Sequence, residues 1–428
     1  MGNATATAVP SAEAAEGLLP GGSLLGAVLI AIGIFLVFMA AYYLPLFIRH
    51  RKVTREKPGK YIGAFFLGFA AMIASAVVQA GFAIIKPIQA AEGVPGVIFG
   101  IFWIMLSVAV TEELLKFFAG RLITDKMPQL NEAGCMMLFG TVGLGFETLE
   151  TIGAGLASPL TVILRCITAL HLVMQLYMGK LWWRAGQAKQ AGNIQLFLKE
   201  RRKALLIPVL IHTVFDYPIL KISKLSDSAD LSIGVVLGTI IGAVLFAVVC
   251  VILILISANR TLKAEKTAQE TAAAQREHKL HILSRVAEGL NSAGVTWCVG
   301  ASLLLYFRGR TEDFHDIDIM VATEDADKAE QVLNGFAQPR PAEPVPQFGT
   351  KRFIEYSIEG VDIDMIAGFS IIQQGREYDC ALQPDQIEDT VTVEGQPVPL
   401  QALGCWKRFY RLMGRNARAD LLKDIEER

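Results

Sequence analysis

Residues 232–257 read SIGVVLGTIIGAVLFAVVCVILILIS, a run without a single charged side chain. A helix needs about 20 apolar residues to cross the hydrocarbon core of a bilayer, so this run is long enough to span one. The same criterion, applied toward the N-terminus, gives six further candidates. The sequence therefore predicts a polytopic α-helical membrane bundle of about seven spans, at residues 23–48, 61–86, 95–120, 134–157, 159–183, 204–222 and 232–257.

The composition separates a membrane part from a soluble part. Hydrophobic residues make up 53% of the 428 residues, and this excess lies before about residue 258. The net charge of −1 predicts no polyanionic partner and gives no indication of nucleic-acid binding. The six cysteines form no C-x-x-C pair, so free thiols are expected. The first 22 residues lack a basic segment, which predicts a flexible N-terminus followed by a retained membrane anchor.

Basic residues in the loops predict the orientation of the spans. The loops after the first, third and fifth predicted spans are rich in lysine and arginine, and these loops alternate along the chain. Because basic loops stay on the cytoplasmic side, the N-terminus is expected outside and the C-terminus inside the cell (inner) membrane. Lys221 and Lys224 would lie on the opposite side, close to Asp227 and Asp230.

Ionisable side chains within the predicted spans are costly to bury in lipid, so each is a candidate functional residue. Thr111-Glu-Glu-Leu-Leu-Lys116 ends the third span, and Gly145-Phe-Glu-Thr-Leu-Glu150 lies in the fourth. His171 lies in the fifth span, and His212 and Asp216 lie in the sixth. Carboxylates and imidazoles from facing helices form metal sites in helical bundles, and this combination suits a zinc-type ion.

Each of these residues also has a structural interpretation. Glu112 and Lys116 are four residues apart and could form an ion pair at a helix end. His171 could be a hydrogen-bonded core residue, and Glu147 could lie at the membrane interface. At about 1.5 Å of rise per residue, Glu150 falls too far toward the outside to meet the histidines. If all of these groups were buried for structural reasons alone, each would need its own hydrogen-bond or ion-pair partner. The set as a whole therefore favours a functional site.

Taken in order, the motifs Glu-Glu-x-x-Lys, Phe-x-x-x-Glu, His and His-x-x-x-Asp resemble those of the PrsW family of intramembrane proteases, which is related to the CAAX prenyl endopeptidase group. The resemblance covers about residues 60–225. It implies an intramembrane peptidase in which Glu112 or Glu113 activates water, with Lys116 in the same catalytic motif. It implies metal-binding or carbonyl-polarising roles for Glu150, His171, His212 and Asp216. Whether the mechanism is of the metallo- or glutamate type stays open.

The C-terminal part has a different character. Residues 259–282 are polar and rich in Ala, Glu, Lys and Gln, which predicts a helical linker. Residues 283–428 show short strand patterns and helices, which predict a small α/β (α+β) domain. Asp316 and Asp318 alternate on one strand and therefore share a face, where two carboxylates suit a divalent cation such as Mg²⁺. Asp364 on a later strand offers a third carboxylate, with Asp362 as the alternate.

Residues 283–425 resemble the nucleotidyltransferase superfamily related to DNA polymerase beta, through Gly300-Ala-Ser302 before a helix, the paired aspartates and the later aspartate. The resemblance implies that Asp316, Asp318 and Asp364 bind Mg²⁺. It also implies that Gly300, Ser302 and Lys407 hold the triphosphate of a nucleotide, expected to be ATP. Ala301 departs from the pattern, since many relatives have a second glycine there. The alternatives are a hairpin with solvent-facing aspartates and a degenerate nucleotide-binding domain.

These features together predict an intramembrane peptidase fused to a cytosolic nucleotidyltransferase-like domain. The expected cofactors are Zn²⁺ in the membrane site and Mg²⁺ in the soluble one. The expected partners are a membrane-protein or peptide substrate, a nucleoside triphosphate and the lipid bilayer. Two other interpretations stay open: a catalytically inactive scaffold that anchors a nucleotidyltransferase, and a transporter or channel whose buried charges line an ion path.

Overall fold

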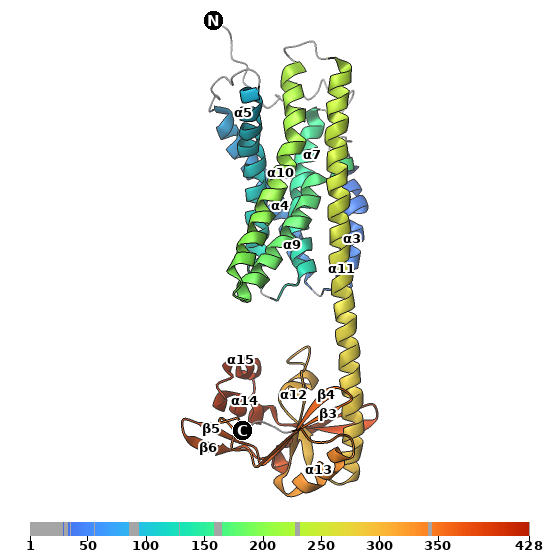
Figure 1. Cartoon of the computed structure of the whole chain (residues 1–428), viewed down its shortest axis with the longest axis vertical. Coiled ribbons are helices and arrows are strands. Elements are labelled where there is room, and N and C mark those ends of the chain that lie inside the picture. Colours follow the sequence, from blue (N-terminus) through green and yellow to red (C-terminus); the bar gives the residue numbers. More distant parts are fainter. Residues whose placement is uncertain are drawn as a thin grey trace. The chain divides into compact units, whose positions relative to one another are not determined.

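The structure is a computed structural model that describes residues 36–54, 56–84, 94–127, 129–157, 165–226, 232–340 and 345–427, together with Leu29, Gly33 and Ile34. The chain divides into two compact units, residues 1–269 and 270–428. The first unit is helical and the second contains a mixed β-sheet (Figure 1). One long helix, α11 (Ile233–Ser292), contributes residues to both units.

The first unit is built from helices joined by short connections. Two π-helical segments interrupt the α-helical pattern, Met39–Tyr43 before α3 and Met105–Val110 between α5 and α6. The α-helices before α11 are α3 (Leu44–Arg51), α4 (Pro58–Ile84), α5 (Val94–Ile104), α6 (Thr111–Thr124), α7 (Glu132–Ala157), α9 (Leu170–Gln190) and α10 (Ile194–Ser226).

Five helices among the described residues are long and apolar enough to cross a membrane, so the predicted number of seven spans is not confirmed. These helices are Pro58–Ile84, Pro95–Thr124, Glu132–Gly153, Ile194–Leu220 and Ile233–Ser292. Much of the expected first span, residues 23–48, lies outside the described residues. Within the expected fifth span, residues 159–183, the helix α9 begins only at Leu170, and it then runs on to Gln190. Lys180, Arg184 and Lys189 make this helix too polar to meet the same criterion.

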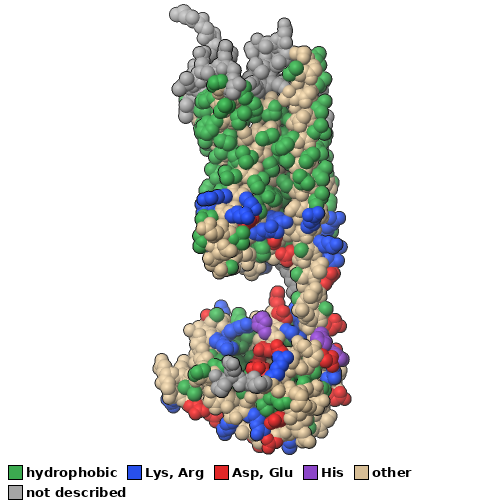
Figure 2. Space-filling model, in the orientation of Figure 1, with side chains coloured by type: hydrophobic (Ala, Val, Ile, Leu, Met, Phe, Trp, Pro, Cys, Tyr) green, Lys and Arg blue, Asp and Glu red, His purple; other side chains and the backbone are tan. Residues whose placement is uncertain are grey.

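The outer surface of the helical unit is apolar, as contact with lipid requires. Figure 2 shows hydrophobic side chains covering most of its visible face, with lysine and arginine side chains gathered toward one end of that face. Ile62, Phe66 and Ile73 of α4 and Leu237 and Ile241 of α11 are all more than half exposed. These residues therefore belong to the surface that would face the acyl chains.

Helix α7 lies at the centre of the unit, and 83% of an apolar 18-residue stretch of this helix is buried. Small residues let its neighbours approach closely, as is common in membrane bundles. A Cβ atom on Gly68 of α4 would lie 2.1 Å from the carbonyl oxygen of Val142. A Cβ atom on Gly143 of α7 would lie 2.7 Å from the carbonyl oxygen of His171. The second contact brings α9 close to α7 at the level where the polar residues meet.

The second unit contains a six-stranded sheet of order β3-β4-β2-β1-β8-β7. Its strands are β1 (Trp297–Val299), β2 (Ile317–Val321), β3 (Arg352–Ile358), β4 (Val361–Ala367), β7 (Ile387–Val393) and β8 (Gln396–Gln401). Strands β2 and β4 run parallel, as do β1 and β8, while β1–β2, β3–β4 and β7–β8 are antiparallel. The mixed sheet agrees with the predicted α/β (α+β) class.

The remaining elements of this unit are short. A separate hairpin is formed by β5 (Ser370–Gln373) and β6 (Arg376–Asp379). The helices are α12 (Ala301–Phe307), α13 (Ala326–Asn334), α14 (Leu403–Leu412) and α15 (Asn416–Ala419), with single 3₁₀ turns at Thr323–Asp325, Pro384–Gln386 and Asp420–Leu422. Trp297, Phe314, Tyr356 and Phe409 are among the large side chains buried in its core. The core is continuous and includes Ile282 to Leu290 at the end of α11.

Candidate active sites

The helices that carry the buried ionisable residues of the first unit are irregular close to those residues. The π-helical segment Met105–Val110 ends just before Glu112. Ala169, which directly precedes α9, has a left-handed backbone (φ +40°) and lies two residues before His171. Pro208 and Pro218 flank His212 within α10. Such interruptions free backbone groups and re-aim side chains, and they occur often at functional sites.

Glu113 and Lys116 form the centre of the cluster. The Lys116 Nζ atom lies 2.7 Å from Glu113 Oε1 and donates to His171 Nδ1, also at 2.7 Å. The other Glu113 oxygen accepts a hydrogen bond from Gln175 Nε2 at 2.9 Å. His212 Nδ1 lies 3.0 Å from Glu113 Oε1. Both oxygens of this fully buried carboxylate are therefore engaged, and it holds together residues from three helices.

Glu112 is placed differently, although it is the adjacent residue. Its Oε1 atom accepts a hydrogen bond from Gln79 of α4, at 2.9 Å. Its Oε2 atom is buried and accepts none. That oxygen lies 3.8 Å from His212 Nε2 and 3.6 Å from the ammonium of Lys116.

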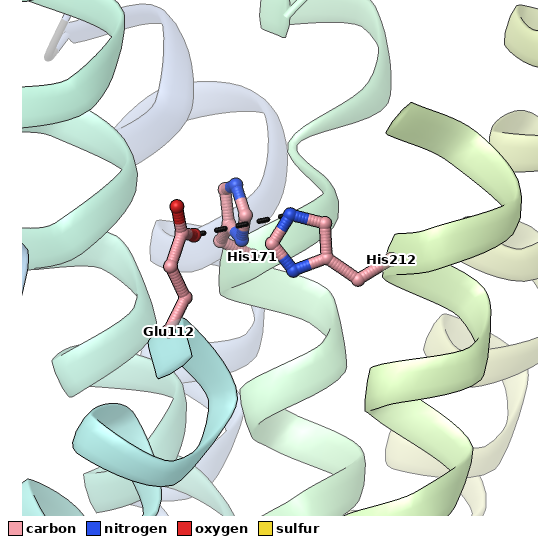
Figure 3. Close-up of side chains that lie close together, drawn as sticks. All are labelled: Glu112, His171 and His212. Atoms are coloured by element: carbon pink, nitrogen blue, oxygen red, sulfur yellow. Dashed lines mark ion pairs between the residues drawn. The ribbon is translucent and has the colours of Figure 1, made fainter. Parts of the chain in front are cut away.

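Glu112, His171 and His212 together offer a set of metal-binding atoms. One ligand atom from each of the three lies within 4.8 Å of the others, and all three side chains are buried. Figure 3 shows them pointing toward one another from α6, α9 and α10. One carboxylate and two imidazoles form a donor set that zinc accepts.

Outer carboxylates fix both imidazoles. His171 Nε2 lies 2.9 Å from Glu150 Oε2, and His212 Nε2 lies 3.0 Å from Asp216 Oδ2. The two rings are 4.8 Å apart and nearly perpendicular. A carboxylate on the second nitrogen of a histidine sets the orientation and basicity of the ring. Glu150 thus reaches His171, contrary to the depth estimate, because His171 is the second residue of α9 and lies beside the late turns of α7.

Two residues of this cluster were not among the predicted site residues. Arg165 contacts Glu150 through its Nη2 atom at 2.5 Å, and its Nη1 atom lies 4.0 Å from Glu147. Glu147 is buried, and its Oε2 accepts a hydrogen bond from the backbone N–H of His171 at 2.8 Å. Glu147 therefore caps the first turn of α9 from a neighbouring helix. An arginine within the predicted fifth span, residues 159–183, was the signal that could have identified Arg165.

The carboxylates of the cluster outnumber its permanent cations. Five carboxylates take part, namely Glu112, Glu113, Glu147, Glu150 and Asp216. Only Lys116 and Arg165 are permanent cations within it. Burying unpaired carboxylates in a medium of low polarity is strongly unfavourable, so the excess has to be neutralised by protons, by charged histidines or by a bound metal ion.

Three aspartates meet in the second unit. Asp318 of β2 lies beside Asp364 in the parallel register of β4, and one oxygen atom from each of Asp316, Asp318 and Asp364 lies within 4.8 Å of the others. Burial and the nearby Asp316 and Asp364 carboxylates raise the pKa of Asp318 well above its usual range. Burial and the Asp316 charge raise the pKa of Asp364 to about 7. Such crowding is relieved when a divalent cation binds between the carboxylates.

A cavity of about 450 Å³ opens onto these aspartates. Its wall is largely aromatic and apolar, and Arg415 and Glu355 are its other charged residues. The apolar and aromatic residues of the wall are Ala301, Val345, Phe348, Phe353, Ile366, Phe369, Trp406 and Met413. A concave apolar pocket with a few converging polar groups is the usual form of a small-molecule site.

Comparisons with known proteins assign both units. Residues 56–256 match the family described as PrsW family intramembrane metalloprotease. Residues 282–427 match the family described as aminoglycoside-2''-adenylyltransferase. The chain carries a PrsW-family domain and a nucleotidyltransferase domain. With its membrane-spanning helices, it is a multi-pass membrane protein.

One solved structure and the curated proteins complete these comparisons. A proposed nucleotidyltransferase from Thermotoga maritima is 22% identical in sequence, over 35% of this chain and 92% of that chain, with a TM-score of 0.30. No curated protein gives a significant match.

The structure brings together all the residues predicted for the PrsW-family site. Glu112, Glu113, Lys116, Glu150, His171, His212 and Asp216 form one continuous network of contacts. The grouping differs from the roles that the resemblance implied. Glu112 completes the group with the two histidines, whereas Glu150 pairs with Arg165 and His171, and Asp216 pairs with His212.

The predicted nucleotide-binding residues of the nucleotidyltransferase domain lie in different surroundings. Ser302 donates a hydrogen bond to Asp316 at 3.4 Å, so it does lie beside the aspartates. Gly300 packs against Trp406, whose Cζ2 atom would lie 2.3 Å from a Cβ at this position. Ala301 has a left-handed backbone (φ +41°), the conformation that a glycine adopts without strain.

Lys407 does not line the cavity. Its ammonium donates to the carbonyl oxygens of Lys423 and Ile425, near the end of the chain. Asp362, the alternate third carboxylate, is exposed and pairs with Arg340 at 3.1 Å. Arg415 is a cavity residue that was not predicted, because the resemblance implied Lys407, in the preceding helix, as the basic residue of the site.

Proposed function

We propose that the PrsW-family domain cleaves peptide bonds of membrane proteins or peptides within the bilayer, using a zinc-type ion held by Glu112, His171 and His212. The observation that carries this proposal is the buried Glu112 Oε2 atom, which accepts no hydrogen bond and lies beside His212. A carboxylate and two imidazoles match the donor preference of such an ion. The excess of carboxylates in the cluster supplies the electrostatic reason to bind it.

The surrounding residues would orient this group. A bound ion of this kind acts as a Lewis acid toward a peptide carbonyl. Glu150 and Asp216 contact the Nε2 atoms of His171 and His212 and would orient the two rings. Glu113 holds His212 and Lys116, and Lys116 keeps a positive charge next to the carboxylates. The surrounding apolar helices limit access of water, which strengthens every electrostatic interaction in the site.

A specific contact favours a second candidate, a glutamate-type peptidase. The Lys116 ammonium lies 2.7 Å from both Glu113 and His171, so a permanent cation already stands where part of a metal site would be. In this alternative Glu112 takes a proton from water, and the histidines stabilise the charge that develops on the substrate carbonyl. Sensitivity to a chelator separates the two mechanisms.

For the second domain we propose Mg²⁺-dependent binding and transfer of a nucleotide, expected to be ATP, at Asp316, Asp318 and Asp364. The loop charges further support a chain with its N-terminus outside and this domain in the cytoplasm, attached to the cell (inner) membrane. That location would supply both ATP and Mg²⁺. In this arrangement the nucleotide state could regulate cleavage in the membrane.

The test is peptide cleavage by the purified full-length chain in detergent, with a library of single-span membrane peptides. Wild type is compared with Glu112→Gln and His212→Ala, each with and without a chelator. His50→Ala is the matched control, because His50 is a buried imidazole bonded to Thr54 and Tyr61 rather than to this cluster. We expect cleavage by wild type and His50→Ala only, and its loss from wild type in chelator.

Other outcomes would change the conclusion. Cleavage that survives the chelator but not Glu112→Gln would establish the glutamate-type mechanism. No cleavage by any folded sample that still binds nucleotide would favour the scaffold that anchors a nucleotidyltransferase. Ion flux in proteoliposomes without cleavage would favour the transporter or channel.

A further inference from the structure

Arg415 occupies a defined position at the edge of the aspartate cavity. Helix α14 ends at Leu412, and the chain then turns through Gly414, whose φ is +72°. The Arg415 N–H donates to the Tyr410 carbonyl and the Gly414 N–H donates to the Arg411 carbonyl. This pair of bonds is the Schellman motif, which fixes the path of the backbone after a helix. Arg415 is thus carried by an ordered turn, and its side chain lines the cavity.

The Arg415 guanidinium differs from most arginines of this domain. Seven of them form ion pairs with carboxylates, namely Arg276, Arg285, Arg308, Arg310, Arg340, Arg352 and Arg411. Within the part of the chain that is described, the Arg415 side chain forms neither an ion pair nor a hydrogen bond. Its charge nevertheless acts on Asp318 and opposes the rise in the pKa of that carboxyl group. The guanidinium and the carboxylate therefore line the same cavity and form no ion pair with each other.

A ligand that fills this space has to satisfy groups of opposite charge. On one side it meets three carboxylates, which bind divalent cations. On the other side it meets a planar guanidinium, which binds phosphate with two parallel hydrogen bonds. A metal-bound polyphosphate carries both kinds of group in one molecule.

We infer that Arg415, rather than Lys407, contacts the phosphates of the nucleotide in this cavity. The inference rests on the proposed nucleotidyl-transfer function. The Lys407 ammonium is already engaged by two carbonyl oxygens, so moving it to a phosphate would leave those acceptors without a donor. Arg415 has no such bonds to give up.

The test uses the full-length chain in detergent with Mg²⁺. Binding of ATP, GTP, CTP and UTP is measured, together with binding of the nucleoside that corresponds to the best of them. We expect Arg415→Gln to weaken triphosphate binding roughly tenfold to a hundredfold, the effect of losing a charge-assisted pair. Nucleoside binding should change less than about twofold. Arg415→Lys should retain part of the affinity, because the charge stays but the fork geometry is lost.

Arg411→Gln is the matched control, since Arg411 lies four residues earlier and pairs with Glu427 outside the cavity. It should bind all ligands like wild type. Triphosphate binding by Arg415→Gln within about twofold of wild type would overturn the role of Arg415 and leave the proposed function standing. Equal losses for triphosphate and nucleoside would mean a structural role and would also overturn it. Failure of wild type to bind any of the four triphosphates would overturn both the inference and the proposed function.

Discussion

Lowering the pH from 8 to 6 should weaken divalent-metal binding to the three aspartates. Asp364 has a pKa of about 7 in the metal-free domain, so at pH 6 it carries a proton that the metal has to displace. At a pH below the raised pKa of Asp364, a proton on the carboxyl group competes with the metal. At a pH above that pKa the carboxyl group is ionised, and this proton no longer competes. Metal affinity should therefore rise with pH between 6 and 8.

The magnitude follows from this single proton. With a pKa of about 7, the fraction of Asp364 that is ionised changes about tenfold between pH 6 and pH 8, and the affinity changes by the same factor. Burial and the Asp316 and Asp364 carboxylates also raise the pKa of Asp318 well above its usual range. Asp318 adds a second proton to be displaced, so tenfold is the lower bound of the expected effect.

A manganese titration would measure this effect, with free Mn²⁺ followed by electron paramagnetic resonance. A His212→Ala background removes one imidazole from the membrane cluster and keeps that site from contributing. Asp364→Asn should flatten the pH dependence between 6 and 8 as well as weaken binding. Asp362→Asn is the matched control, because Asp362 is exposed and paired with Arg340. Equal affinity at pH 6 and pH 8, within about twofold, would refute the reasoning.

Three further substitutions test the packing of the two sites. Gly300→Ala should destabilise the soluble domain by about 1–3 kcal/mol and lower its melting temperature, because the added Cβ would lie 2.3 Å from Trp406. Glu147→Ala should reduce peptide cleavage, because it removes the acceptor of the His171 N–H. Glu147→Gln keeps an acceptor oxygen and should retain most of the cleavage. Equal losses in both variants would argue against a role of Glu147 as the cap of α9. Lys116→Met leaves a buried carboxylate without its cation, at a cost of about 3–5 kcal/mol, and should show as poor accumulation of folded protein in detergent.

The membrane site could be anticipated because charge within apolar runs has few structural explanations. Glu112, Glu113, His171 and His212 stood out for this reason, and they meet in the structure. The different surroundings of Glu112 and Glu113 could not be predicted from the sequence. Adjacent residues lie about 100° apart on a helix, and both can face the interior of a bundle. Only the positions of Gln79, Gln175 and Lys116 decide which of the two keeps an unpaired oxygen.

The aspartates of the soluble domain show a similar limit. Alternation along a strand predicts that Asp316 and Asp318 share a face, and the structure agrees. The same rule cannot choose between Asp362 and Asp364, because they also alternate on one face. Asp364 is selected by the pairing of β4 with β2, which sets it beside Asp318. Pairing between strands so far apart in the sequence depends on the tertiary fold.

The phosphate-binding residue was harder to predict because it depends on where a helix ends. The sequence predicts a helical tail from Leu400 to Arg428, which would carry Lys407. The chain instead forms β8 up to Gln401 and a helix that stops at Leu412. The turn through Gly414 then places Arg415 at the cavity. Lys407 instead donates to the carbonyl oxygens of Lys423 and Ile425. The position at which helix α14 ends thus decides which basic residue lines the aspartate cavity.

The arrangement of the membrane residues bears on the transporter interpretation. A proton or ion path needs ionisable groups at successive depths, because each step has to be short compared with a bilayer of about 30 Å. In the described part of the first unit, one cluster joins carboxylates and histidines from four helices, with contacts of 2.5 to 4.0 Å; its members are Glu112, Glu113, Glu147, Glu150, His171, His212 and Asp216. A single dense cluster of this kind suits chemistry at one bond. For this reason peptide cleavage, rather than ion flux, is the activity to measure first.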